Sequence, residues 1–134
     1  MINRKETKKI YVGSVPVGGD SFISIQSMTN TNTKDIKSTV SQIKKLEKAG
    51  CDIIRMAVND LEDAAALKEI KKEIKIPIIS DIQFDYKLAL AAAENESDAI
   101  RLNPGNIGES WKIKEVTEAC KFYNIPIRVG VNSG

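Results

Sequence analysis

The chain has 134 residues, of which 42% are hydrophobic and 28% are charged, and its formal net charge is +2 at pH 7. These values are typical of one globular domain and exclude a disordered chain. A charge this close to balance argues against a partner such as nucleic acid or an anionic membrane. No apolar run is long enough to span a bilayer, and the first residues lack a signal peptide's apolar stretch, so a cytoplasmic protein is expected.

The sequence has no histidine and two cysteines, Cys51 and Cys120, which are far apart and form no Cys-x-x-Cys pattern. Two cysteines cannot build a metal or cluster site by themselves, so no metal site is expected within this chain. We expect two small buried thiols in a reducing compartment.

The predicted elements begin with a short hairpin over residues 10–19, where two apolar runs flank glycine turns. Short apolar runs then alternate with helical patterns. Strands are predicted at 23–27, 53–57, 78–82, 99–102 and 127–131. Helices are predicted at 35–49, 60–72, 85–95 and 110–123, capped at the last three starts by Asp60, Asp85 and Ser110. Gly50 is expected to end the first helix, and Tyr123 is placed on the inner stripe of the last one.

This order is a β(αβ) unit repeated four times, which predicts an α/β fold with a parallel sheet and right-handed crossovers. Each unit takes about 25 residues, the spacing of a TIM-type (β/α)₈ barrel. A doubly wound sheet is the rival architecture, but the Gly-x-Gly-x-x-Gly turn that often follows its first strand is absent. Five strands do not close an eight-stranded barrel. The last strand also has no helix to cover it, so residues 1–134 are expected to be the truncated N-terminal part of a longer barrel protein.

Three predicted strands contain an arginine where a buried strand should be apolar: Arg55, Arg101 and Arg128. Burying an unpaired guanidinium costs several kcal/mol, so each arginine needs an anionic partner. Arginine also matches phosphate and carboxylate geometry with two parallel hydrogen bonds. The arginines therefore indicate a site for a phosphorylated metabolite.

Strand periodicity puts further polar residues on the same faces, because side chains at i and i+2 point the same way. Asn103 then accompanies Arg101, and Asn132 accompanies Arg128. Asp81 and Gln83 occupy the corresponding end of another strand. All of them fall at carboxyl ends of strands, where barrel enzymes build their active sites. The alternative is that the arginines only pair with acids inside the barrel, but Asp81 is the one acid at a matching strand end.

Two loops at the same rim could either bind a ligand or form ordinary turns. Residues 103–108 contain glycines whose backbone N–H groups can face an anion, although such turns are common. Residues 26–33 are rich in hydroxyls and amides, which serve equally well in ligand binding or in a capping turn.

The segments 26–31, 80–86, 100–108 and 127–132 together resemble the 4-hydroxy-3-methylbut-2-en-1-yl diphosphate synthase family of the non-mevalonate isoprenoid pathway. The resemblance covers about residues 8–134, and its specificity comes from four motifs in series. It implies an N-terminal barrel that binds 2-C-methyl-D-erythritol 2,4-cyclodiphosphate and a C-terminal domain, absent from this chain, that holds a [4Fe–4S] cluster. It also implies reductive ring opening and dehydration, ferredoxin or flavodoxin as electron donor, and a homodimer.

By this resemblance Arg55, Asp81, Gln83, Arg101, Asn103, Arg128 and Asn132 are substrate-binding positions, while no catalytic residue is assigned. The family commonly has histidine where Gln83 stands. Glutamine forms hydrogen bonds but does not transfer a proton at neutral pH, which argues against an acid–base role there. The cluster ligands are absent, and the isolated chain is expected to be inactive. The alternatives are a pterin-using barrel synthase of the dihydropteroate synthase type and a non-catalytic anion-binding half barrel.

Overall fold

The computed structural model describes residues 3–132 and contains two sheets. A hairpin pairs β1 (Ile10–Val12) with β2 (Val15–Val17). The parallel sheet contains β3 (Gln26–Met28), β4 (Ile53–Ala57), β5 (Ile78–Ile82), β6 (Ala99–Leu102) and β7 (Ile127–Val129) in chain order. The helices are α1 (Ile36–Lys48), α2 (Leu61–Glu73), α3 (Tyr86–Glu94), α4 (Pro104–Ile107) and α5 (Ser110–Phe122).

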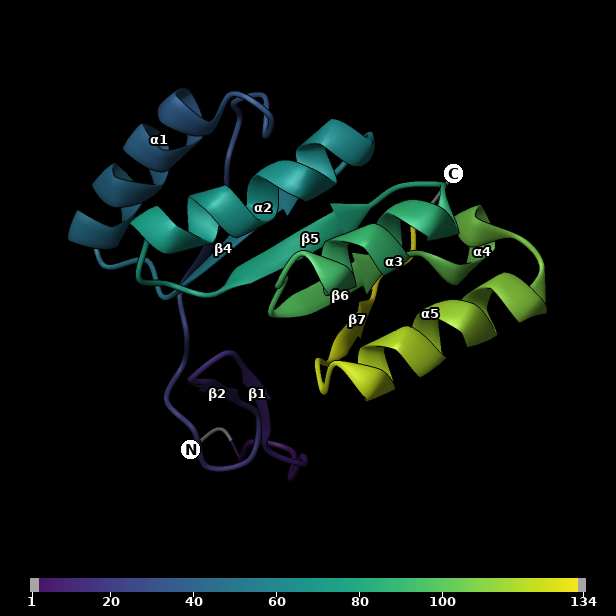
Figure 1. The fold of residues 1–134 in the computed structure, drawn as a ribbon. Helices are drawn as coiled ribbons and strands as arrows, with labels where there is room; N and C mark the ends of the chain where they lie inside the picture. Colours follow the sequence, from purple (N-terminus) through teal and green to yellow (C-terminus); the bar gives the residue numbers. More distant parts are fainter. Residues whose placement is uncertain (1–2, 133–134) are drawn as a thin grey trace.

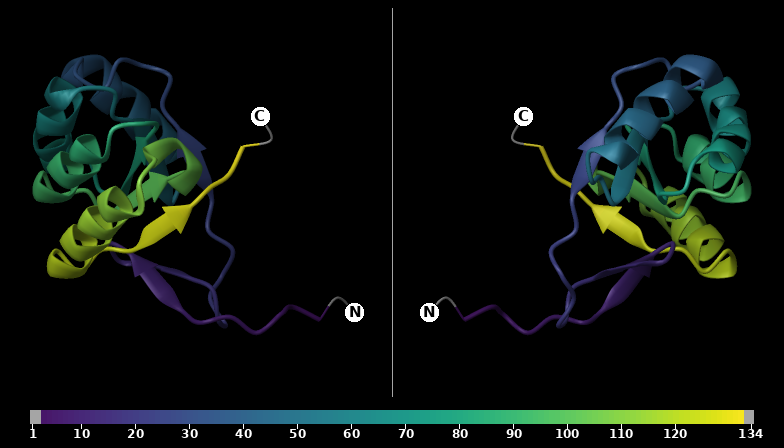
Figure 2. Two further views of the ribbon diagram at one scale, coloured as in Figure 1. Left: turned by 90° about the vertical axis from the view of Figure 1, so that its right-hand side faces the viewer. Right: turned by 90° about the vertical axis from the view of Figure 1, so that its left-hand side faces the viewer.

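The crossover helices all cover one face of the parallel sheet (Figures 1 and 2). A doubly wound sheet would have helices on both faces and a reversal in strand order, whereas here the spatial order equals the chain order. The predicted five-stranded (β/α) barrel arrangement with an N-terminal hairpin is therefore confirmed. Within residues 3–132, no helix combines the length and apolar character needed to cross a membrane.

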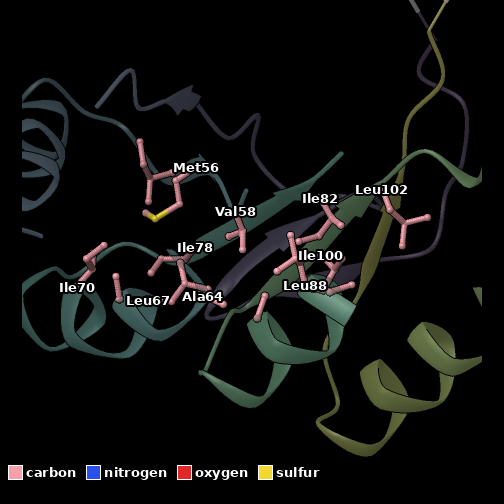
Figure 3. Close-up of a cluster of buried hydrophobic side chains, with 14 of the residues drawn as sticks. Met56, Val58, Ala64, Leu67, Ile70, Ile78, Ile82, Leu88, Ile100 and Leu102 are labelled. Atoms are coloured by element: carbon pink, nitrogen blue, oxygen red, sulfur yellow. The ribbon is translucent and has the colours of Figure 1, made fainter. Parts of the chain in front are cut away.

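The main core lies between the sheet and the helices (Figure 3). Alternate strand residues point to this side, because successive side chains of a strand face opposite ways. The fully buried side chains there include Ile54, Met56, Leu67, Ile70, Ile78, Ile82 and Ile100. This packing fixes the register of the strands. The side chains on the other face of the sheet are therefore aligned as well.

A second, smaller core lies on the other face of the sheet, at the first residues of the strands. Ile53, Ile79 and Ala99 pack there with Val12 of the hairpin, and Val15 and Val17 are partly buried against them. The hairpin thus covers the amino end of the barrel interior and leaves the carboxyl ends of the strands open.

Aspartates begin three of the helices, as their side chains accept hydrogen bonds from first-turn N–H groups. Asp35 accepts from Ser38 N at 3.2 Å, Asp60 from Asp63 N at 2.8 Å and Asp85 from Lys87 N at 2.9 Å. The predicted caps at Asp60 and Asp85 are confirmed, and Gly50 follows α1 with a left-handed φ of 98°. The predicted cap at Ser110 is wrong. Ser110 is the first helical residue of α5, and the N-cap residue Glu109 forms no side-chain capping hydrogen bond.

The two edge strands are shorter than predicted. Ile23 and Ile25 are 74% and 59% exposed and lie outside β3. The backbone of Ile25 bonds the Asp52 carboxylate and the N–H groups of Asp52 and Ile53. The strand β7 ends at Val129 rather than at residue 131, although Gly130 N still donates to Leu102 O at 3.0 Å. An edge strand pairs on one side only, which leaves its ends less constrained.

Tyr123 is also placed differently from the prediction. It follows the last residue of α5 and is 42% exposed, with its ring edge-on to Phe122 at 5.0 Å between centroids. The helical period no longer applies beyond the helix end, so the inward stripe stops at Cys120.

Two leucines of α2 provide a test of the core. Leu67 is fully buried and Leu61 is 66% exposed. We expect Leu67→Ala to lower the free energy of unfolding by about 3 kcal/mol, because it leaves a cavity. Leu61→Ala should change it by less than about 0.5 kcal/mol. Urea unfolding of both variants measures this, and similar losses in the two would contradict the orientation of α2.

Candidate functional site

A buried carboxylate, that of Asp81, lies at the centre of the polar cluster on the open face of the sheet. Asp81 is 1% exposed. Its Oδ2 accepts from Arg55 Nη2 at 2.9 Å and from Gln83 Nε2 at 2.9 Å, and its Oδ1 is 3.3 Å from Arg101 Nη1. One carboxylate thus holds two guanidinium groups from the neighbouring strands β4 and β6.

The strand register explains why these side chains meet. Asp81 is aligned with Arg101, and Arg101 with Arg128, so β5, β6 and β7 present these residues side by side. Arg55 is aligned with Ile79, which lies two residues before Asp81, so its side chain reaches Asp81 from the amino-terminal side of the strand. Because parallel partners face the same side of a sheet, the four side chains share the barrel interior. We call Arg55, Asp81, Arg101 and Arg128 the arginine cluster.

Arg128 differs from the other two arginines in its partner. It is exposed, and its Nη1 donates to Oε1 of Gln26, a neutral acceptor, at 2.8 Å. Among residues 3–132, no carboxylate forms an ion pair with it. Three guanidinium charges against one carboxylate leave the arginine cluster with a formal charge of +2. The alternative of simple internal pairing therefore accounts for only part of the cluster.

One fully buried donor of this cluster has no hydrogen-bond partner within the described part of the chain. Arg55 Nε is buried and has no acceptor among residues 3–132. Buried N–H groups are nearly always hydrogen-bonded, and a donor without a protein acceptor commonly bonds water or a ligand. The excess positive charge is what makes the site suited to an anion with several oxygen atoms.

Gly130 allows Arg101 to occupy its position. A Cβ atom built at Gly130 would overlap the Arg101 guanidinium, at Nη2, Nε and Cζ. Any larger residue at this position would force the Arg101 guanidinium to shift. Strand periodicity puts Gly130, two residues after Arg128, on the same face, but that spacing does not reveal its contact with Arg101 of the neighbouring strand.

The two asparagines are less directly connected to the cluster. Asn103 is 7% exposed and its Oδ1 accepts from Gly105 N at 3.0 Å, capping the short helix α4. The backbone N–H groups of residues 105–108 are all satisfied within this segment, since those of Asn106 and Ile107 bond Asn103 O and that of Gly108 bonds Pro104 O. These bonds argue against the predicted role of the loop N–H groups in facing an anion. Asn132 is exposed, and within residues 3–132 no hydrogen bond joins its side chain to the cluster.

Most polar residues between 29 and 33 stabilise the turn before α1. Asn30 N donates to Gln42 Oε1 at 3.0 Å, the hydroxyls of Thr31 and Thr39 are 2.7 Å apart, and Thr33 Oγ1 donates to Ala57 O at 2.6 Å. These contacts favour the structural interpretation of this loop. Thr29 is an exception, because its buried hydroxyl has no partner among residues 3–132. Gln26, at the start of the predicted 26–33 loop, instead lies in β3 and is the partner of Arg128.

The described residues do not fit an iron–sulfur cluster, which needs several cysteine thiolates. Cys51 is buried and its Sγ donates to Ile53 O at 3.1 Å, and Cys120 is 2% exposed in the main core. Among residues 3–132, no three His, Cys, Asp or Glu side chains are grouped to hold a metal ion. Burial raises the pKa of the Cys120 thiol to about 11, which keeps it neutral and unreactive at physiological pH.

The pKa of Cys120 makes stability depend on pH. The folded state holds the thiol proton up to about pH 11, whereas an exposed thiol loses it near 9.0. The unfolded state therefore ionises first, and the contribution of Cys120 to stability should be complete below pH 9 and decline between pH 9 and 11. Urea midpoints should fall more steeply over that range for the wild type than for Cys120→Ala, and parallel curves would contradict this.

Removing the carboxylate tests the arginine cluster. We expect Asp81→Asn to lower the free energy of unfolding by about 3 kcal/mol, because two largely buried guanidiniums lose their counter-charge. Added pyrophosphate should restore part of this loss. As a control, Asp20→Asn removes an exposed partner of Lys9, 2.7 Å away, and should leave the urea midpoint unchanged. An Asp81→Asn variant as stable as wild type would show that the cluster is not held by this carboxylate.

Solved structures with a similar fold are distant in sequence. A 7,8-dihydropteroate synthase from Vibrio fischeri has a TM-score of 0.68 and 15% identity, covering 96% of this chain and 50% of that one. A mandelate oxidase has a TM-score of 0.53 and 11% identity, covering 81% of this chain and 50% of that one. At these identities the likeness shows the barrel fold alone.

Curated relatives are much closer in sequence. The 4-hydroxy-3-methylbut-2-en-1-yl diphosphate synthase (flavodoxin) of Clostridium perfringens is 61% identical over 133 residues, covering 99% of this chain and 38% of that protein. The protein of the same description from Sulfurimonas denitrificans is 60% identical over 134 residues, again covering 38% of its length. The chain thus spans less than two fifths of these relatives. The family model for the GcpE TIM-barrel domain matches residues 7–134, so the chain belongs to the GcpE TIM-barrel family.

Proposed function

We propose that this chain is the substrate-binding barrel of a 4-hydroxy-3-methylbut-2-en-1-yl diphosphate synthase, which opens the ring of 2-C-methyl-D-erythritol 2,4-cyclodiphosphate reductively and removes water. The observation that carries the proposal is the arginine cluster, whose excess charge of two faces the open end of a barrel. The identity of the chain to synthases of this name supports it.

In this proposal the guanidiniums of Arg101 and Arg128 bind the diphosphate, since they are neighbours in register and only one is paired with a carboxylate. Arg55 contributes positive charge beside the Asp81 carboxylate. Asp81 holds Arg55 and Arg101 in place, and Gln83 completes the hydrogen bonding of the same carboxylate. Asn103 and Asn132 lie on the rim side, where they can bond the oxygen atoms of the carbon skeleton.

The function of these residues is binding and orientation. Fixed guanidiniums stabilise a diphosphate without reorganising during the reaction, and they hold the ring of the substrate in one orientation. The [4Fe–4S] cluster of this activity would be held by a further domain, outside the described residues. The full-length protein would be a homodimer, and its electrons would come from a separate donor protein. The names of the relatives specify flavodoxin, so we propose flavodoxin rather than ferredoxin as donor.

A chimera tests the proposal directly. This chain would replace the matching 38% of the Clostridium perfringens protein. We expect the chimera, with its cluster assembled, to convert the cyclodiphosphate when reduced flavodoxin is supplied, and the cyclodiphosphate to raise its melting temperature. Dihydropterin should not raise it. A cluster-containing chimera that neither binds nor converts the cyclodiphosphate would refute the proposal.

A matched pair of variants tests the placement of the site. Arg128→Ala should weaken cyclodiphosphate binding roughly ten- to a hundredfold, because it removes charge-assisted hydrogen bonds to the ligand. Lys44→Ala removes the same charge from the exposed side of α1 and should leave affinity unchanged. Isothermal titration of both variants measures the difference, and equal losses would contradict a site at Arg128.

A further inference from the structure

The hydrogen bond between Gln26 and Arg128 joins the two edge strands of the sheet. Gln26 lies in β3 and Arg128 in β7, 102 positions apart in the sequence, yet Nη1 and Oε1 are 2.8 Å apart. The strands β4, β5 and β6 lie between them in the sheet. The contact therefore passes across the concave face rather than along the sheet, and it spans the barrel interior.

The same two residues border a cavity on the hairpin side. This cavity has a volume of about 500 Å³, and its walls are mostly apolar, including Val12, Ile53 and Ile79. Gln26 and Arg128 are also among its lining residues. A diphosphate does not enter an apolar space, because its charge would lose water without gaining partners. The Gln26–Arg128 pair thus supplies polar groups at the border of a mostly apolar cavity.

The chemical nature of Gln26 matters for the charge of the site. An amide oxygen orients a guanidinium through a hydrogen bond but leaves its charge intact, whereas a carboxylate would neutralise it. Arg55 and Arg101 already share the Asp81 carboxylate. Arg128 is thus the arginine of the cluster that combines a fixed position with an uncompensated charge.

We propose that Gln26 is a positioning residue of the anion site: it holds Arg128 across the barrel interior and so forms the floor on which a diphosphate rests. The inference rests on the proposed function and adds to it a residue that the sequence motifs did not assign. Gln26 acts through Arg128. Its contribution to affinity therefore exists only while Arg128 is present.

A double-mutant cycle in the full chain tests this, with inorganic pyrophosphate as the probe in isothermal titration. Gln26→Met keeps the side-chain length but removes the acceptor, and it should weaken binding about three- to tenfold. In an Arg128→Ala background the same substitution should cause no further loss. Gln26→Glu should weaken binding more than Gln26→Met and make it less sensitive to salt, because the new carboxylate neutralises Arg128.

The control is Gln42→Met, the same chemical change at an amide that bonds Asn30 near α1. It should bind pyrophosphate as the wild type does. Wild-type affinity in Gln26→Met, or an equal loss with and without Arg128, would overturn the inference and leave the proposed function standing. A wild-type chain and a chimera that both fail to bind would overturn both.

Discussion

The ion pairs of Asp81 determine how the barrel interior is organised. A carboxylate that is 1% exposed is stable there only because two guanidiniums and an amide satisfy it. In turn, Arg55 and Arg101 remain inside the barrel only because that carboxylate offsets part of their charge. The three side chains are thus interdependent, whereas Arg128 bonds the neutral amide of Gln26 and keeps its charge uncompensated among residues 3–132.

This arrangement depends on the apolar layer on the opposite face of the sheet. The packing of Ile54, Ile78 and Ile100 against the helices fixes the heights of β4, β5 and β6. Strand side chains alternate, so the same register that buries these isoleucines places arginine and aspartate on the inner face. A shift of one residue in any of these strands would bury the charges among the helices.

The barrel interior is divided along its axis into an apolar and a polar part. The hairpin packs against Ile53, Ile79 and Ala99 at the amino ends of the strands, and the arginine cluster lies nearer the carboxyl ends. Charge is thereby concentrated at the open mouth, where loops such as 103–108 are also found. This division agrees with the general placement of ligand sites in parallel barrels and with the membership of the chain in the GcpE TIM-barrel family.

Apart from the short helix α4, where the sequence predicts a loop, the element order, the barrel architecture and the polar positions at the strand ends could be predicted from the sequence, because hydrophobic periodicity and aspartate caps are local signals. The sequence also identified Arg55, Asp81, Arg101 and Arg128 by their unexpected charge in apolar strands. Three contacts could be seen only in the folded chain: Asp81 bonds two arginines, Gly130 leaves space for Arg101, and Gln26 bonds Arg128. These contacts join residues from different strands, and in the last case the opposite edges of the sheet. The curvature that brings them together results from packing over the whole domain, which no local pattern of residues specifies.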